Sequence, residues 1–334
     1  MKLRKLFVFF VLCCLLSSCR LSMDNKEKED EIDIAVVRYD KLINEYVEFN
    51  SFSALQKMNT EYAAQTKLLV ENVLGLGQVN DNNINGKLKS FFSDTTLHKL
   101  MEDALVKYKD MSDIEEQLTR GFKKLKRELP SIKTPIIYTQ FSALNESVVV
   151  EDSIVGISLD KYMGRDYPLY KRYFYDYQCK SMNECRIVPD CFTYYLLSEY
   201  PFSRESTHTL LDVIVHMGKI SYIVAYILDY NSYGEEFGYT KEETKWCENN
   251  RKVIWEYMIQ NNHLNATDPM ILRKYTKPAP CTAFFGETSP SMIGSWMGIQ
   301  IIDSYMKHHK EVSIQELLAQ TNSQLILADA KFKP

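Results

Sequence analysis

The chain has 334 residues, of which 45% are hydrophobic and 25% charged, and this globular composition excludes a wholly disordered or fibrous protein. The low content of 12 Gly and 10 Pro favours long helices over a many-stranded sandwich or barrel. The formal charge of -4 provides no basic footprint for nucleic acid, and the single apolar run near the start argues against several membrane spans.

The first 18 residues have the features of a bacterial lipoprotein signal peptide. A basic segment, residues 1–5, precedes an apolar stretch of 11 residues, 6–16, which is too short to span a bilayer. Leu16-Ser17-Ser18-Cys19 then resembles a lipobox, in which the Cys19 thiol becomes diacylglyceryl-modified. We therefore predict a mature N-terminus at Cys19, with an ordinary secretory signal as the alternative.

The segment after Cys19 is acidic. Cleavage before Cys19 removes three basic residues, which leaves 37 basic and 44 acidic side chains and a formal charge of -7. Because residues 24–33 (DNKEKEDEID) contain six acids and almost no apolar side chain, residues 19–34 are predicted to form a solvated tether. Residues 35–334 contain no Pro/Gly/Ser-rich linker and are predicted to form one domain. The anchor predicts a place in the cell envelope, at the outer membrane facing the periplasm, with the cell surface as an alternative.

The first half of the mature chain is predicted to be helical and then extended. Apolar residues at helical spacing predict two helices within residues 36–77 and one or two long helices within 87–128. Residues 75–80 (GLGQVN) begin like a dinucleotide-binding fingerprint, but the last Gly is missing and no strand precedes them, so a loop is predicted. β-Branched residues predict one strand in 135–141 and two strands in 147–159.

After residue 160 the chain is predicted to be helical again. The expected helices lie near residues 166–177, 187–199, 207–230, 241–260, 290–308 and 313–321. Helices, a small sheet and then helices indicate an α+β fold, mostly α, instead of the alternating order of a doubly wound fold. The helix at 207–230 is apolar nearly all round, so we expect it to be the central helix on which the small sheet packs.

The single polar stripe of the central helix consists of Asp212, His216 and Lys219. Zinc peptidases present the motif H-E-x-x-H on such a helix, but here the Glu and the second His are absent. A charged Lys219 would repel a dication. We therefore predict a packed or solvent-facing stripe, with a binding cleft or a working zinc site as alternatives.

The remaining patterns give no catalytic, cofactor-binding or metal-binding residue. Five cysteines follow Cys19, namely Cys179, Cys185, Cys191, Cys247 and Cys281. Because their number is odd, at least one thiol is free or paired between chains. Buried free thiols and a disulfide within the chain both remain open. Gly294 and Gly298 predict close approach of a neighbouring helix instead of a phosphate site. His308 and His309 are predicted to end a helix, where cations are favourable.

Several stretches resemble the gliding-motility lipoproteins called GldB, within a wider group related to zincin-like peptidases. They are residues 157–170, 213–222, 238–255, 279–305 and 312–318, with 246–250 (WCENN) and 289–305 the most specific. Gly218, Lys219 and Tyr222 match a Gly-Lys motif of the family, whereas His216 departs from it.

The resemblance implies a degenerate zincin-like domain that has lost its metal ligands. It also implies a non-catalytic component of an envelope machine for gliding motility or secretion, held on the membrane through Cys19 and binding other envelope proteins. A zinc-dependent peptidase with atypical ligands is the alternative.

Overall fold

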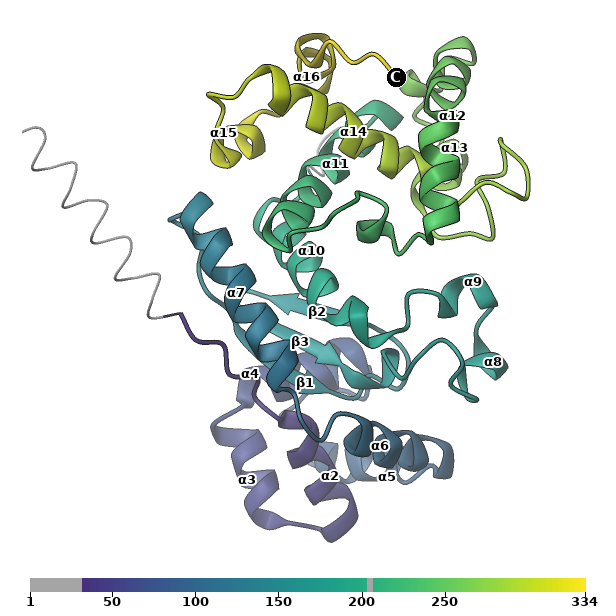
Figure 1. Cartoon of the computed structure of the whole chain (residues 1–334). Helices are drawn as coiled ribbons and strands as arrows, with labels where there is room; N and C mark the ends of the chain where they lie inside the picture. The colour runs from purple at the N-terminus through teal and green to yellow at the C-terminus, as the bar shows by residue number, and fades with distance from the viewer. Residues whose placement is uncertain (1–31, 203–206) are drawn as a thin grey trace, which may run out of the picture.

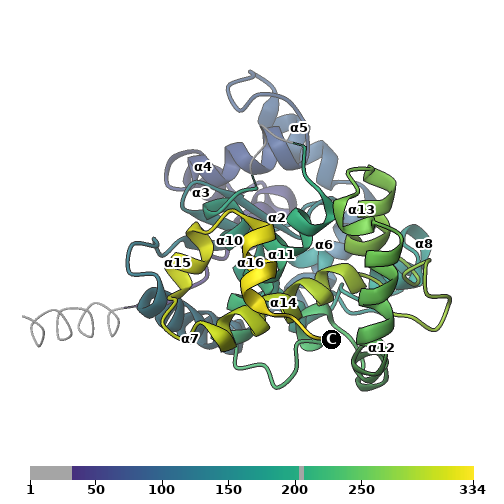
Figure 2. The same ribbon diagram turned by 90° about the horizontal axis from the view of Figure 1, so that it is seen from above.

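A computed structural model describes residues 32–202 and 207–334 of the chain (Figure 1). The predicted signal peptide, the lipidation site Cys19 and most of the predicted tether lie outside the described residues. Within the described part, a small sheet lies between the N-terminal helices and the C-terminal helices (Figure 1). In Figure 1 the helices within residues 39–107 lie at one end of the molecule and those within residues 210–330 at the other. Figure 2 looks along this direction from above, with the N-terminal helices farther from the viewer.

The sheet has three strands in the order β1-β3-β2, and its strands confirm the prediction. They are β1 (Ile136–Gln140), β2 (Val148–Glu151) and β3 (Ile154–Ser158). β1 is parallel to β3, with Ile137 opposite Val155, and β2 is antiparallel to β3. Asp152 lies in the left-handed region, at φ 48°, in the turn that joins β2 to β3, as expected for a short acidic turn residue.

The N-terminal half contains more and shorter helices than predicted. They are α2 (Tyr39–Phe49), α3 (Phe52–Thr60), α4 (Ala63–Lys67), a π-helical turn (Leu68–Val73), α5 (Ile84–Phe92), α6 (Thr95–Lys107) and α7 (Ser112–Glu128). Short polar residues at the helix ends explain the additional breaks. Ser51 caps α3 by accepting a hydrogen bond from the N–H of Ala54, and Asp94 caps α6 in the same way.

The C-terminal half matches the prediction more closely. Its helices are α8 (Tyr170–Tyr173), α9 (Asp176–Cys179), α10 (Ile187–Glu199), α11 (Leu210–Ile227), α12 (Lys241–Gln260), α13 (Pro269–Thr276), α14 (Ile293–His308), α15 (Ile314–Ala319) and α16 (Ser323–Ala330). The prediction missed α13 and α16, although the Asp268 cap followed by Pro269 is a typical helix start. His308 is the last residue of α14, as predicted.

The helix in closest contact with β2 and β3 is α10, whereas the expected central helix 207–230 shares the hydrophobic core of the sheet only through its C-terminal part (Figure 1). α10 buries apolar residues around most of its surface, which lets it lie between the sheet and α11. α11 instead joins two hydrophobic cores: Ile223 and Ile227 pack in the core of the sheet, and Leu211 and Ile214 in the core of the C-terminal helices. Within the described ranges, α11 alone is long and apolar enough to cross a membrane, but 67% of it is buried inside the protein.

α11 and α14 cross in backbone contact, and glycines make this possible. A Cβ atom on Gly298 would lie 1.9 Å from the carbonyl oxygen of Ile214, and one on Gly218 would lie 2.5 Å from the carbonyl carbon of Gly298. Gly294 faces α13 instead, where a Cβ would lie 2.6 Å from that of Tyr275. The predicted role of Gly294 and Gly298 in close helix approach is therefore confirmed.

The first described residues pack against α7. Ile32 and Ile34 are buried, and the N–H of Ile34 donates to Oγ1 of Thr119 over 2.9 Å. The N–H of Val36 donates to Oε1 of Glu115 over 2.7 Å. Residues 32–34 therefore belong to the folded part and not to the predicted tether, because their apolar side chains contribute to the core.

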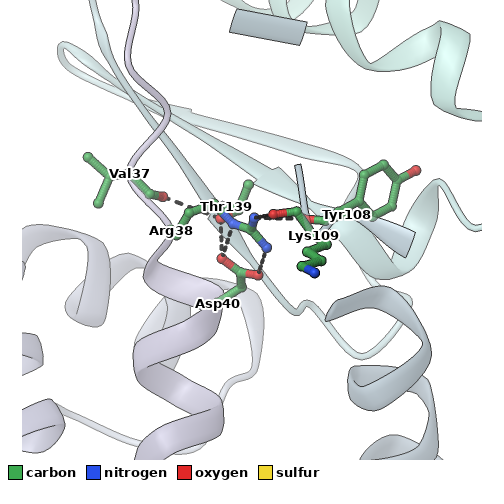
Figure 3. A network of polar contacts seen from close by, with 6 residues as sticks. All are labelled: Val37, Arg38, Asp40, Tyr108, Lys109 and Thr139. Atoms are coloured by element: carbon green, nitrogen blue, oxygen red, sulfur yellow. Dashed lines mark hydrogen bonds and ion pairs between the residues drawn. The ribbon is translucent and has the colours of Figure 1, made fainter. Parts of the chain in front are cut away.

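The next residues attach the chain to the edge of the sheet. Val37 forms a parallel bridge with β1, in which its carbonyl accepts the N–H of Thr139 over 2.9 Å. Figure 3 shows the polar network that follows. The fully buried Asp40 carboxylate accepts hydrogen bonds from Arg38 Nη2, over 2.7 Å, and from the Thr139 hydroxyl. Arg38 Nη1 donates a hydrogen bond to the carbonyl of Tyr108 over 2.6 Å. We call residues 34–40 with these contacts the N-terminal clamp.

Candidate functional site

The three residues of the predicted polar stripe on α11 have separate roles. Asp212 forms a capping box with Thr209: its Oδ2 accepts the N–H of Thr209 over 2.8 Å, and its own N–H donates to Oγ1 of Thr209 over 3.2 Å. Asp212 therefore fixes the start of the helix.

Lys219 is buried, with 5% of its surface exposed, so the packed alternative for the stripe applies to this residue. Its Nζ donates to the backbone carbonyl of Gln320, between α15 and α16. No ion pair joins Lys219 to an acid within residues 32–202 and 207–334. Burial lowers the pKa of Lys219 from 10.5 to about 8.

His216 lies against the ring of Phe202, with 4.7 Å between the ring centroids. Its Nε2 is buried and has no hydrogen-bond partner among the described residues. Burial, together with the neighbouring Lys219 and His208, lowers the pKa of His216 to about 4, so the His216 imidazole is neutral at pH 7. The unpaired nitrogen has a metal ligand's lone pair, but a dication would lie beside Lys219. Nowhere in the described ranges do three or more His, Cys, Asp or Glu side chains gather as metal ligands. The residues present do not fit a zinc site.

A buried acid near α10 was not predicted. Glu236, in a short helical turn after α11, is 5% exposed. Its Oε1 accepts a hydrogen bond from the hydroxyl of Thr193 over 3.3 Å. Burial raises the pKa of Glu236 to about 8, even though Arg186 lies close by. Arg186 donates to the Glu236 carbonyl oxygen and to Asp190 Oδ1, each over 2.8 Å. These contacts tie the turn to α10, which is a structural role.

A polar pocket of about 390 Å³ lies between the segment before α10 and the start of α12. Its lining residues are Arg165, Asp176, Tyr177, Lys180, Thr240, Glu243, Ala279, Pro280 and Ser291. Lys180 Nζ and Glu243 Oε1 are 2.6 Å apart, and this ion pair joins the α9 end to α12. Arg165 and Asp176 are exposed, and neither has an ion-pair partner within the described part of the chain.

The pocket offers charges of both signs beside aromatic rings. The ring of Tyr177 stacks on that of Tyr175, with centroids 5.8 Å apart and planes 7° apart. Arg165 and Asp176 would pair with groups of opposite charge on a segment seated in the pocket. Three of the stretches that carry the family resemblance, 157–170, 238–255 and 279–305, supply six of the nine lining residues. Sequence reasoning missed the pocket because its residues come from distant places in the chain.

The five cysteines within the described residues are free thiols, which favours free thiols over a disulfide within this part of the chain. Cys179, Cys191 and Cys247 are buried, whereas Cys185 is exposed and Cys281 is half-buried. Burial raises the pKa of Cys191 and Cys247, so their thiols are protonated and inert at neutral pH.

A family model described as gliding motility protein GldB matches residues 21–334, which is nearly the whole chain after the predicted signal peptide. Comparison with curated proteins and with solved structures gives no match.

Proposed function

The chain belongs to the GldB family of gliding-motility lipoproteins, and we propose that it is a non-catalytic, membrane-anchored component of the gliding machinery. In this proposal Cys19 carries the lipid anchor, and the folded part stands at the outer membrane, facing the periplasm. The partners are other envelope proteins of motility or secretion. The fold is proposed to be a zincin-like domain without its metal ligands.

The chemistry of α11 supports the absence of catalysis. A zinc peptidase needs at least three protein ligands and a water at its metal. Here the face of α11 offers one imidazole, that of His216, beside the buried amine of Lys219. Asp212 is held in a helix cap. The lack of a second metal ligand beside His216 on α11 is the main support for a non-catalytic function.

We place partner binding at the polar pocket. Its support is the convergence of three of the resembling stretches on one hollow, together with the unpaired charges of Arg165 and Asp176. A partner segment with an acid and a base at matching spacing would pair with both groups.

Site-specific crosslinking tests this placement. A photo-reactive amino acid at Arg165 should crosslink an envelope protein in native membranes, and mass spectrometry would identify it. The same group at Lys252, an exposed residue of α12 outside the pocket, is the control and should give no such product. Equal products from both positions, or none from Arg165, would contradict binding at the pocket.

The second candidate is a zinc-dependent peptidase with atypical ligands, in which the unpaired Nε2 of His216 would be one ligand and groups outside the described residues would supply the others. The metal content of the purified protein separates the two functions. The non-catalytic proposal expects no stoichiometric zinc and no change with His216→Ala. Stoichiometric zinc that is lost in His216→Ala would establish the peptidase alternative instead.

A further inference from the structure

Two phenylalanines point into solvent at the corner between α2 and α3. Phe49, the last residue of α2, is 72% exposed, and Phe52, the first residue of α3, is 77% exposed. Among the described residues, they are the only phenylalanines with so much exposed surface. Large apolar side chains exposed together mark an interaction site more often than isolated ones do.

The corner is fixed by its own contacts. Asn50 lies in the left-handed region, at φ 53°, and its Oδ1 accepts a hydrogen bond from Lys89 Nζ over 2.9 Å. Ser51 caps α3 by accepting the N–H of Ala54. The other face of α2 is buried in the core. The two phenyl rings are therefore held outward by ordered structure on both sides.

We propose that this corner inserts into the interfacial region of the membrane that holds the lipid anchor. The inference rests on the anchor proposed at Cys19. Twelve residues, 20–31, separate Cys19 from the first described residue, and they reach at most about 40 Å when extended. α2 carries the chain only about 16 Å from the sheet edge to the corner. The corner is therefore within reach of the leaflet that holds the anchor.

The chemistry of the corner selects a lipid surface without net charge. The corner carries charges of both signs, with Glu45 and Glu48 on the last turns of α2 and Lys89 beside Asn50, so no local basic patch draws it to an anionic surface. The formal charge of -7 on the mature chain opposes such a surface. Burial of two phenyl rings supplies the attraction. Because α2 and α3 lie at the opposite end from α12 and α14, insertion would point the C-terminal helices away from the membrane (Figures 1 and 2).

Tryptophan fluorescence in vesicles tests the insertion. The full lipidated chain with Phe52→Trp is reconstituted in phosphatidylcholine vesicles, with and without bromine on the acyl chains, and the signal of the unsubstituted protein is subtracted. The control is Val253→Trp, because Val253 is 56% exposed on α12 at the other end. We expect bromine to quench the added emission of Phe52→Trp by at least a third and to leave Val253→Trp unchanged.

Flotation of the same vesicles separates the two proposals. If the protein floats with the vesicles but Phe52→Trp is not quenched, the insertion is overturned and the anchor stands. If the protein does not float, both proposals fail. In detergent, the emission of Phe52→Trp could instead shift to the blue as the protein concentration rises. Such a shift, together with no quenching in vesicles, would show that the corner contacts a second copy of the chain, and it would also overturn insertion.

Discussion

Replacing Lys219 with Met should stabilise the protein at neutral pH. The pKa of Lys219 falls from 10.5 to about 8 on folding, and at about 1.4 kcal/mol per unit the buried charge costs roughly 3 kcal/mol. Met fills a similar volume without the charge. It also removes the donor to the Gln320 carbonyl, which costs roughly 1–2 kcal/mol. The net expectation is a gain of about 1–2 kcal/mol in the free energy of unfolding at pH 7.

The gain should disappear at high pH, and the sign follows from proton binding. Between pH 8 and 10.5 the unfolded chain keeps a proton on Lys219 that the folded chain releases, so the stability of the unsubstituted protein rises in this window. At pH 10 most of the charge penalty is gone, but the hydrogen bond to Gln320 remains. Because about 0.8 kcal/mol of the charge penalty remains at pH 10, Lys219→Met should be between equally stable and about 1 kcal/mol less stable than the unsubstituted protein there.

Urea unfolding followed by circular dichroism at pH 7, 8, 9 and 10 measures this difference. Comparing the two proteins at each pH cancels the titration of the other groups. Lys252→Met is the control, because the Lys252 side chain is 72% exposed and its replacement should give a small, pH-independent change. A stability difference for Lys219→Met that does not vary with pH would refute the reasoning, since Lys219 would then titrate alike in both states.

Three further changes follow from particular contacts. Gly298→Ala should prevent folding or lower the free energy of unfolding by more than about 3 kcal/mol, because the new Cβ would overlap the Ile214 carbonyl. Soluble yield and thermal unfolding measure this effect, with Gln300→Ala on α14 as the control. Glu236→Gln should change stability little at pH 5 and raise it by roughly 2 kcal/mol or more at pH 9. The folded protein keeps the Glu236 proton that the unfolded chain releases, so the unsubstituted protein loses stability as the pH rises from about 4.5 to about 8; equal urea midpoints at pH 9 would contradict this. Cys19→Ala should leave an uncleaved precursor or a protein released from washed membranes, and unchanged mobility with unchanged retention would exclude lipidation.

Local patterns predicted the strands well and the helix boundaries less well. The runs of β-branched residues in 135–159 mark strands because their side chains fit a pleated, half-buried surface. In residues 36–77 the apolar spacing continues across Asn50 and Ser51, so periodicity joins α2 to α3. The cap that separates them is a contact of a single side chain, which the spacing of apolar residues does not register.

The tertiary contacts lay beyond the reach of the sequence. Apolar residues all round the helix at 207–230 indicated burial, but not that α10 would come between it and the sheet. The partner of Lys219 is a backbone carbonyl about a hundred residues away, and no side-chain pattern marks such a group. The pocket around Lys180 and Glu243 likewise exists only after distant segments meet.

The N-terminal clamp determines how tension on the anchor would enter the folded protein. A pull on the tether acts first on residues 34–37, whose backbone bonds to Thr119, Glu115 and β1 run across the direction of the chain. Bonds in this arrangement are sheared together instead of opening one after another. Behind them, the buried ion pair of Arg38 and Asp40 passes the force to the sheet and to the end of α6. A pull on an anchor at Cys19 would therefore meet bonds to α7, β1 and the end of α6 before it reached the rest of α2.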